Sequence, residues 1–349
     1  MTESNLTDLF LALTPEKVLE AVEAAGLACN PVCYPLNSFE NRVYEVELED
    51  QTRIISKFYR PGRWTQAQIL EEHAFLEELK ADEIPVCPTQ RFPEGETLRQ
   101  IDDIWYCLFE RRGGRAPDEL TDDQAERLGM LTARIHNTGH GREASHRLVM
   151  SADIWIRANV EWLCENSRIP PHLEARYCKA AERVAEVADA RLRGVEMHRI
   201  HGDLHMGNLL LREGVFNVLD FDDMVVGPAV QDLWLMLPGR DDWTRRQRGA
   251  FIEGYERFRR FDRSSLLLIE PLRGMRMVHY TTWLARRWHD PIFPRTWPHF
   301  GTDQYWQEST ADLEDLVTLI ETEEQPAAAL VEAEEPALTN KDYFFDWDD

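Results

Sequence analysis

The sequence predicts an α+β fold in two lobes, in which a small antiparallel β-sheet lobe precedes a larger helical lobe. The chain has 349 residues, more than a single hydrophobic core usually holds. Alternation typical of strands dominates its first part, and helical periodicity dominates its second part. The segment RRGGRAP at 111–117 interrupts both patterns. We therefore expect lobes at 1–112 and 113–325 and a separate tail at 326–349.

The composition is that of a globular protein without affinity for polyanions. Hydrophobic residues make up 43% of the chain, and the net charge of −24 argues against binding to nucleic acids or anionic membranes. The sequence contains no apolar run of about 20 residues, and no basic leader segment is found at its start. The six cysteines form no C-x-x-C pair, which is typical of free thiols in a reducing compartment. We expect a cytoplasmic monomer that binds neither nucleic acid nor membranes.

The elements of the first lobe are predicted from caps and alternation. A helix begins after Thr14, which can cap it, with Pro15 in its first turn and Gly26 at its end. A second helix is expected at 65–80, where Glu72 falls on an otherwise apolar face. The expected five strands lie at 31–36, 43–48, 53–59, 86–91 and 104–110.

The second lobe is predicted to be mostly helical. A helix at 121–139 opens with Thr121 and Gln124 at the spacing of a capping box. A long helical region at 151–193, a strand around NVLD at 217–220 and helices to about residue 320 follow. The acidic tail at 326–349 has weak periodicity, so we expect it to be disordered, and its motif DYFFDWDD is a candidate docking segment.

The stretch IHGDLHMGNLLL at 200–211 places polar side chains beside an aliphatic run. Asp203 lies five residues before Asn208, and Asp220 follows twelve residues later. This spacing is typical of the catalytic loop and the metal-binding aspartate of protein kinases. Asp203 would accept the proton of an acceptor hydroxyl, and Asn208 and Asp220 would offer Mg²⁺ the hard oxygen ligands that it prefers. A polar loop without chemistry and a zinc site at the two histidines are the alternatives.

Two charged residues of the first lobe fit the same chemistry. Lys57 lies in the middle of the third strand, where a kinase lysine contacts ATP phosphates. Glu72, one helix later, is placed to pair with Lys57, and Glu71 is the alternative partner. Without this chemistry, Lys57 would be an edge-strand lysine and Glu72 a solvated helix residue.

Several blocks resemble known families. HGDLHMGN followed by LDFDD resembles the aminoglycoside phosphotransferase and choline kinase branch of the protein-kinase-like fold. More narrowly, PLNSFENRVYEVE, KFYRPGRWT and IEPLRGMRMVHYTTWLARRWHDP resemble the bacterial stress response kinase A family, also called RdoA. The resemblance covers about residues 10 to 320. It implies a cytoplasmic serine/threonine protein kinase that uses ATP and Mg²⁺, acts in stress survival and takes protein substrates, including itself.

The resemblance also implies roles for single residues. Asp203 and Asp220 would be active-site residues, Asn208 and Asp220 would hold Mg²⁺, and Ser38 would meet the ATP phosphates. The backbone from Phe109 to Arg111 would hold the adenine.

The sequence departs from the kinase pattern at two places. The turn NSFENR has no glycine, so side chains of Ser38 and Asn41 would replace part of a backbone cradle. After Asp220 come Phe221 and Asp222 rather than Phe and Gly, and no A-P-E stretch follows, so we expect a short activation segment that is not controlled by phosphorylation.

Other functions and other residues stay open at this point. A small-molecule kinase acting on amino-alcohols or aminoglycosides fits the broad motif equally well, and a nucleotide-binding pseudokinase is a further alternative. Asp232 is expected to support the catalytic loop, as is His201, whereas His205 has no assigned role. The arginines of the segment 273–287 form either an ion-paired face or an anchor for an acidic substrate group. The members of this arginine cluster are Arg273, Arg276, Arg286 and Arg287.

Overall fold

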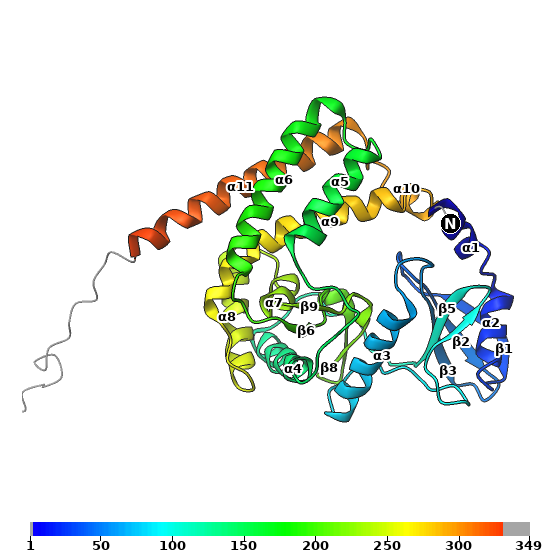
Figure 1. Ribbon diagram of the computed structural model, residues 1–349. Coiled ribbons are helices and arrows are strands. Elements are labelled where there is room, and N and C mark those ends of the chain that lie inside the picture. The colour runs from blue at the N-terminus through cyan, green and yellow to red at the C-terminus, as the bar shows by residue number, and fades with distance from the viewer. Residues whose placement is uncertain (1–2, 331–349) are drawn as a thin grey trace, which may run out of the picture.

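The computed structural model describes residues 3–330, with side chains described from 7 to 322. It confirms the predicted α+β class with an antiparallel sheet lobe and a larger helical lobe (Figure 1). The sheet has the strand order β1-β2-β3-β5-β4, and every pairing in it is antiparallel. The strands are β1 (Cys29–Pro35), β2 (Arg42–Leu48), β3 (Arg53–Phe58), β4 (Arg99–Ile101) and β5 (Ile104–Glu110).

Helices cover both faces of this sheet. Helices α1 (Glu3–Leu11) and α2 (Pro15–Glu23) lie on the outer face, and α3 (Gln66–Ala81) lies between the sheet and the second lobe (Figure 1). The predicted cap at Thr14 is confirmed, because its side chain accepts from the third residue of α2. Thr65, for which no cap was predicted, forms a capping box with Gln68 on α3. Helix α1 was not predicted. It is held by Phe10, which is 1% exposed.

The predicted strand at 86–91 is wrong. The segment forms two isolated bridges, Val86 with Val218 and Thr89 with Phe109, rather than a ladder. Pro88 interrupts it, and proline cannot donate to a ladder. The fifth strand is β4, a segment of three residues that follows the turn at Gly95. Val86 instead joins the first lobe to the second, since the N–H of Val218 donates to the carbonyl of Pro85 (2.9 Å).

The second lobe confirms the predicted helices. The strand predicted around 217–220 corresponds to β8, which ends at Val218, and three further short strands lie near the catalytic stretch. The predicted helical region at 151–193 is a helix pair preceded by a π-turn at Asp153–Arg157. The helices are α4 (Asp122–His140), α5 (Ala158–Glu165), α6 (Pro171–Leu192), α7 (Val230–Met236), α8 (Asp242–Glu256), α9 (Ile269–Arg286), α10 (Ile292–Thr296) and α11 (Asp303–Leu330). The short strands are β6 (His198–Ile200), β7 (Leu209–Arg212), β8 (Val215–Val218) and β9 (Val225–Gly227).

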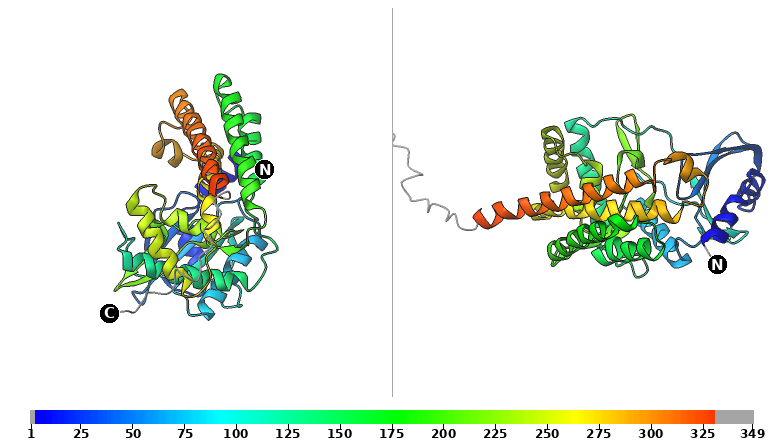
Figure 2. Two further views of the ribbon diagram at one scale, coloured as in Figure 1. Left: turned by 90° about the vertical axis from the view of Figure 1, so that its left-hand side faces the viewer. Right: turned by 90° about the horizontal axis from the view of Figure 1, so that it is seen from above.

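The end of the chain differs in part from the expectation. Helix α11 runs beside α6 and α9 and continues to Leu330, so the first five residues of the predicted disordered tail at 326–349 are helical (Figure 2). The remainder, including the motif DYFFDWDD, lies outside the described residues. The helices of the described part include none long and apolar enough to cross a membrane.

Candidate active site

The catalytic stretch forms a loop between β6 and β7. Gly202 adopts a left-handed φ of +84°, and a Cβ there would lie 2.2 Å from the carbonyl oxygen of Asp223, so this position requires glycine. The side-chain amide of Asn208 donates to the carbonyl of Asp203 (2.9 Å), which leaves the Asn208 carbonyl oxygen available as a ligand. The N–H of Leu219 in turn donates to the Asn208 backbone carbonyl (2.9 Å), which ties the loop to the residue before Asp220.

The buried carboxylate of Asp232 holds this loop in place, as predicted. It is fully buried at the start of α7 and accepts the backbone N–H groups of His201 and Gly202, each at 2.9 Å. His136 of α4 contacts the same carboxylate at 3.0 Å. His201 braces the loop as well, through a 2.8 Å hydrogen bond with the carbonyl of Leu219. Burial opposes ionisation of Asp232, but these hydrogen bonds and the nearby imidazoles keep its pKa below the usual value.

Asp220 occupies a special backbone position at the end of this hairpin. Its φ is +57°, in the left-handed region that few non-glycine residues adopt, and its side chain is half exposed. One of its carboxylate oxygens lies 2.9 Å from the Nζ of Lys57, which reaches across from β3. The structure therefore brings Lys57, Asn208, Asp203 and Asp220 to one place between the lobes.

Lys57 is buried among three carboxylates. Besides Asp220, its Nζ lies 3.3 Å from Asp222 and 3.5 Å from Glu72. Burial alone would lower the pKa of Lys57, but the three carboxylates outweigh it and hold the pKa well above the usual value. Glu72 is itself 1% exposed, and burial raises its pKa to about 7 although Lys57 and Arg147 favour its charged form.

Glu71, the alternative partner of Lys57, has a different task. Its carboxylate accepts the backbone N–H groups of residues 145, 146 and 147 at 2.7 to 3.0 Å. Glu71 therefore fixes a segment of the second lobe to α3, whereas Glu72 faces Lys57.

Two arginines that the sequence analysis did not identify complete this network. Arg147 is buried, lies 3.3 Å from Glu72 and donates to the carbonyl of Asp222 (2.9 Å). Arg63 contacts the carboxylates of Asp222 and Asp223. Burial disfavours the charged form of Asp222, yet Lys57 and the two arginines keep its pKa well below the usual range. The segment after Asp220 is thus held in place by charged side chains from both lobes.

The glycine-free turn NSFENR is anchored to the helical lobe. Glu40 accepts from Trp283 Nε1 (2.5 Å) and Arg287 (2.7 Å), and the Phe39 ring lies 4.8 Å from that of Trp297. Burial opposes the charge on Glu40, but the surrounding arginines lower its pKa to about 2. The buried Asp290 accepts from Arg42 (3.0 Å) and Arg60 (2.9 Å) of the first lobe.

The other residues predicted to bind the nucleotide lie in the turn between β1 and β2 and around the end of β5. Ser38 is half-buried in the turn between β1 and β2. Asn41 is 3% exposed and accepts the N–H of Arg60 at 3.2 Å, so it stabilises the turn from inside. Phe109 lies near the end of β5, and Arg111 follows this strand with its side chain turned to Glu45 of β2 (2.6 Å). Their predicted contacts with a nucleotide stay predictions.

Asp203 has two cationic or polar neighbours. Arg276 of α9 lies 2.7 Å from one carboxylate oxygen, and His205 Nε2 lies 3.4 Å from the other. Burial raises the pKa of Asp203, but the hydrogen bonds from His205 and Arg276 reverse this and hold the pKa well below the usual range. The structure thus gives His205 a neighbour that the sequence did not indicate. Asp203 is therefore held as an ionised carboxylate.

The arginine cluster of α9 does not act as one unit. Arg273 pairs with Glu270 (2.9 Å), Arg287 with Glu40, and the guanidinium of Arg286 lies over the Trp162 ring at 4.7 Å. Only the pairing of Arg276 reaches the predicted catalytic residue.

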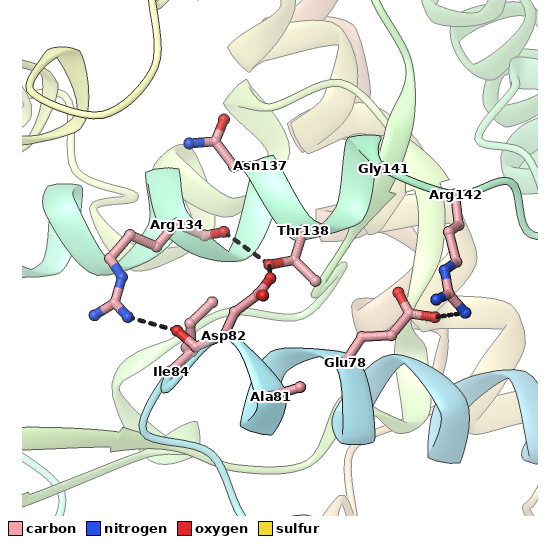
Figure 3. Close-up of a pocket in the computed structure, with 9 residues that line it drawn as sticks. All are labelled: Glu78, Ala81, Asp82, Ile84, Arg134, Asn137, Thr138, Gly141 and Arg142. Atoms are coloured by element: carbon pink, nitrogen blue, oxygen red, sulfur yellow. Dashed lines mark hydrogen bonds and ion pairs between the residues drawn. The ribbon is translucent and has the colours of Figure 1, made fainter.

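A surface cavity elsewhere is separate from this site. It measures about 490 Å³ and lies between the end of α3 and α4 (Figure 3). Its polar side chains contact one another: Asp82 accepts from Thr138, Glu78 pairs with Arg142, and Arg134 donates to the Asp82 carbonyl. None of the predicted catalytic or nucleotide-binding residues lines it, so the cluster of Lys57, Asp203, Asn208 and Asp220 is the candidate active site.

The residues present fit a metal–nucleotide complex of the kinase type. Asn208 and Asp220 offer two oxygen donors on adjoining segments, and Mg²⁺ usually takes only one or two protein carboxylates besides phosphates and waters. Lys57 supplies the cation that a triphosphate requires. Among the described residues, no group of three or more His, Cys, Asp and Glu side chains is arranged to hold a metal ion by itself.

Comparison with known proteins agrees with this geometry. A model of the phosphotransferase enzyme family matches residues 33–269. The chain belongs to this family. Stress response kinase A of Escherichia coli (strain K12) is 39% identical over 309 residues, which cover 88% of this chain and 94% of the relative. The serine/threonine protein kinase RdoA of Salmonella typhimurium (strain LT2) is 39% identical over 302 residues, which cover 86% and 92%.

Solved structures show that the fold is shared with kinases of small molecules. An amicoumacin kinase in complex with AMP-PNP, Ca²⁺ and Ami superposes with a TM-score of 0.68 at 20% identity, covering 88% of this chain and 93% of that one. A microcompartment-associated aminopropanol kinase superposes with a TM-score of 0.64 at 20% identity, covering 87% and 96%. The phosphotransferase family member described here therefore has a kinase fold and kinase relatives.

Proposed function

We propose that this phosphotransferase is an ATP-dependent serine/threonine protein kinase that acts in a stress response. The single observation that carries the kinase chemistry is the convergence of Lys57, Asp203, Asn208 and Asp220 in the cleft between the lobes. The choice of a protein acceptor is supported by the 39% identity to the RdoA kinase over most of both chains. The cofactors are ATP and Mg²⁺, by analogy with the nucleotide and divalent ion named for the amicoumacin kinase.

Each residue has a defined task in the proposed reaction. Lys57 holds the phosphate tail of the nucleotide, while Glu72 and Arg147 keep its side chain in place. Asn208 and Asp220 hold Mg²⁺, which neutralises the phosphate oxygens when it is bound. Asp203 accepts a hydrogen bond from the acceptor hydroxyl, directs its oxygen at the γ-phosphorus and takes its proton. Positioning and electrostatics account for most of the rate, so a weakly basic carboxylate is sufficient.

The substitution Asp203→Asn tests this assignment. The amide keeps the shape of the side chain but cannot accept the proton, so we expect transfer to fall by about 10²- to 10⁴-fold. The assay follows radiolabel from ATP to serine or threonine of a generic basic protein and of the enzyme itself, with Mg²⁺ present. ATP affinity of the variant should stay near that of the wild type. Equal labelling by both proteins would contradict the assignment of Asp203.

A small-molecule phosphotransferase is the second candidate, because the solved structures with this fold include an amicoumacin kinase and an aminopropanol kinase. The same preparation separates the two functions. ATP consumption that requires an added amino-alcohol, without label on protein, would favour the second candidate. Nucleotide binding without any turnover would leave a pseudokinase.

A further inference from the structure

One face of α9 connects the catalytic carboxylate with the nucleotide turn. Arg276 contacts Asp203 at one end of this face, and Trp283 and Arg287 contact Glu40 at the other. Residues 276, 280, 283 and 287 follow one another at helical spacing, so they share this face. One end of this face therefore lies at Asp203, where an acceptor hydroxyl must arrive, and the other end lies at the turn NSFENR.

The side chains in the middle of this face of α9 are partly exposed, so a ligand can contact them. Tyr280 is 40% exposed, and its ring stacks on that of Trp283 with the centroids 5.5 Å apart. Arg276 is 42% exposed. A guanidinium carries five N–H donors, and a single contact of 2.7 Å to Asp203 leaves donors that can face the cleft.

Arg276 differs from its neighbours in the partner that it contacts. Arg273 and Arg287 pair with Glu270 and Glu40, carboxylates that hold segments of the protein together. The partner of Arg276 is instead the carboxylate that must receive the acceptor hydroxyl. An arriving acceptor therefore meets a guanidinium directly beside the oxygen that orients its hydroxyl.

We propose that the acceptor carries an anionic group next to its hydroxyl and that Arg276 binds this group. For the protein kinase proposed above, on which this inference rests, the substrate is a serine or threonine flanked by an acidic residue. Arginine suits this task because its planar fork matches a carboxylate or phosphate in two parallel hydrogen bonds. A cationic acceptor would be repelled at the same position.

The acidic groups around the cleft do not oppose this assignment. Asp220 faces Lys57 and Asp223 faces Arg63, so both carboxylates have cationic partners. The net charge of −24 acts at long range, where it is screened beyond about 8 Å at physiological salt, whereas the contact with Arg276 is local.

The experiment compares the wild type with Arg276→Gln, Arg276→Lys and the matched control Arg273→Gln on the same helix. Each protein is given ATP, Mg²⁺ and serine peptides that differ only in one flanking residue, which is Asp, Gln or Lys. We expect the wild type to prefer the Asp peptides. In Arg276→Gln, the ratio of kcat/KM for the Asp peptides to kcat/KM for the Gln peptides should fall by about 10- to 100-fold, mainly through KM, while any effect that acts through Asp203 changes both peptides alike. Arg276→Lys should restore part of the preference, and Arg273→Gln should keep all of it.

The outcomes separate this inference from the proposed function. Labelled peptides without an acidic preference, or a preference that Arg276→Gln leaves intact, would overturn the role of Arg276 while the kinase function stands. If no peptide is labelled, the proteins are compared on the hydroxy acid glycerate and on ethanolamine. A preference for glycerate that Arg276→Gln removes would support the anionic acceptor and reject the protein substrate. Equal use of both, or preference for ethanolamine, would reject the two proposals together.

Discussion

At the scale of single residues, neighbouring positions with the same side chain have different tasks. Glu71 and Glu72 are adjacent glutamates on α3, yet Glu72 faces Lys57 and Glu71 accepts backbone N–H groups of the second lobe. The sequence favoured Glu72 because it lies on the apolar stripe of the helix. Arg63 and Arg147 could not be found in this way, because no local pattern shows that two distant arginines surround Asp222.

The pair Glu71→Gln and Glu72→Gln tests this division. Glu72→Gln removes the charge that holds Lys57, so we expect kcat/KM for ATP to fall by about 10- to 100-fold. Glu71→Gln weakens the contacts to residues 145–147, so the free energy of unfolding should fall by about 1 to 3 kcal/mol, with a smaller effect on ATP. Steady-state kinetics with varied ATP and urea unfolding measure the two effects. Equal kinetic losses in both variants would mean that Glu71 shares the task of Glu72.

The catalytic loop also contacts a charged residue that lies far from it in the sequence. The spacing of Asp203, Asn208 and Asp220 was enough to predict one site, because a short loop and a hairpin bring them together. The sequence did not indicate that Arg276 contacts Asp203, since 73 residues separate the two. The sequence allowed two interpretations of the clustered arginines, an ion-paired face and an anchor for an acidic substrate group, and three-dimensional contacts were needed to distinguish Arg276 from the other three.

At the scale of elements, the turn NSFENR replaces glycine with tertiary anchors. A glycine-rich loop approaches phosphates through its backbone. Here, Glu40 and Phe39 hold the turn against α9 and the residues after α10, and Asp290 holds Arg42 and Arg60. The absence of glycine could be read from the sequence, but these partners come from a segment more than 240 residues later.

Loosening this anchor should weaken nucleotide binding. Arg287→Gln removes the ion pair with Glu40, so the turn gains mobility and must be ordered again when ATP binds. We expect KM for ATP to rise by about 3- to 10-fold, with a smaller change in kcat. The exposed Arg295 of α10 gives the control Arg295→Gln, which should leave both constants unchanged. An unaltered KM in Arg287→Gln would show that the turn is held sufficiently by its other contacts.

The sheet shows where prediction of elements fails. Strands β2, β3 and β5 were predicted within a few residues, because their sequences are rich in β-branched and aromatic residues over six or seven positions. β4 has three residues and makes only an edge pairing with β5, so its sequence RQI carries no alternation that could be recognised. Residues 86–91 have a strand-like composition, but Val86 and Cys87 are buried in a segment that forms only isolated bridges.

At the scale of the whole molecule, the two-lobed arrangement was predictable because the periodicity changes at one place. The pH dependence of stability could not be predicted from the sequence, because it depends on how deeply titratable groups are buried. His198 of β6 is 5% exposed, and its ring lies 4.8 Å from that of His136, beneath the catalytic loop. Burial lowers the pKa of His198 to about 3. An unfolded histidine has a pKa of about 6.5.

This difference makes folding depend on pH with a defined sign. Below about pH 6.5 the unfolded chain binds a proton at His198 that the folded protein excludes, so this contribution to stability is present at neutral pH and is lost as the pH falls. The variant His198→Leu lacks this loss of stability at low pH. Relative to the wild type, the free energy of unfolding of the variant should therefore rise by about 2 kcal/mol between pH 7 and pH 5. Urea unfolding at both pH values measures the difference.

The comparison between variant and wild type isolates this one group. Glu72, whose raised pKa acts in the opposite direction over part of the same range, is present in both proteins and cancels. The exposed His299 supplies the control, and His299→Leu should show no pH-dependent difference from the wild type. A constant offset between His198→Leu and the wild type from pH 7 to pH 5 would mean that His198 takes up its proton in the folded protein. The interior beneath the catalytic loop would then be open to water.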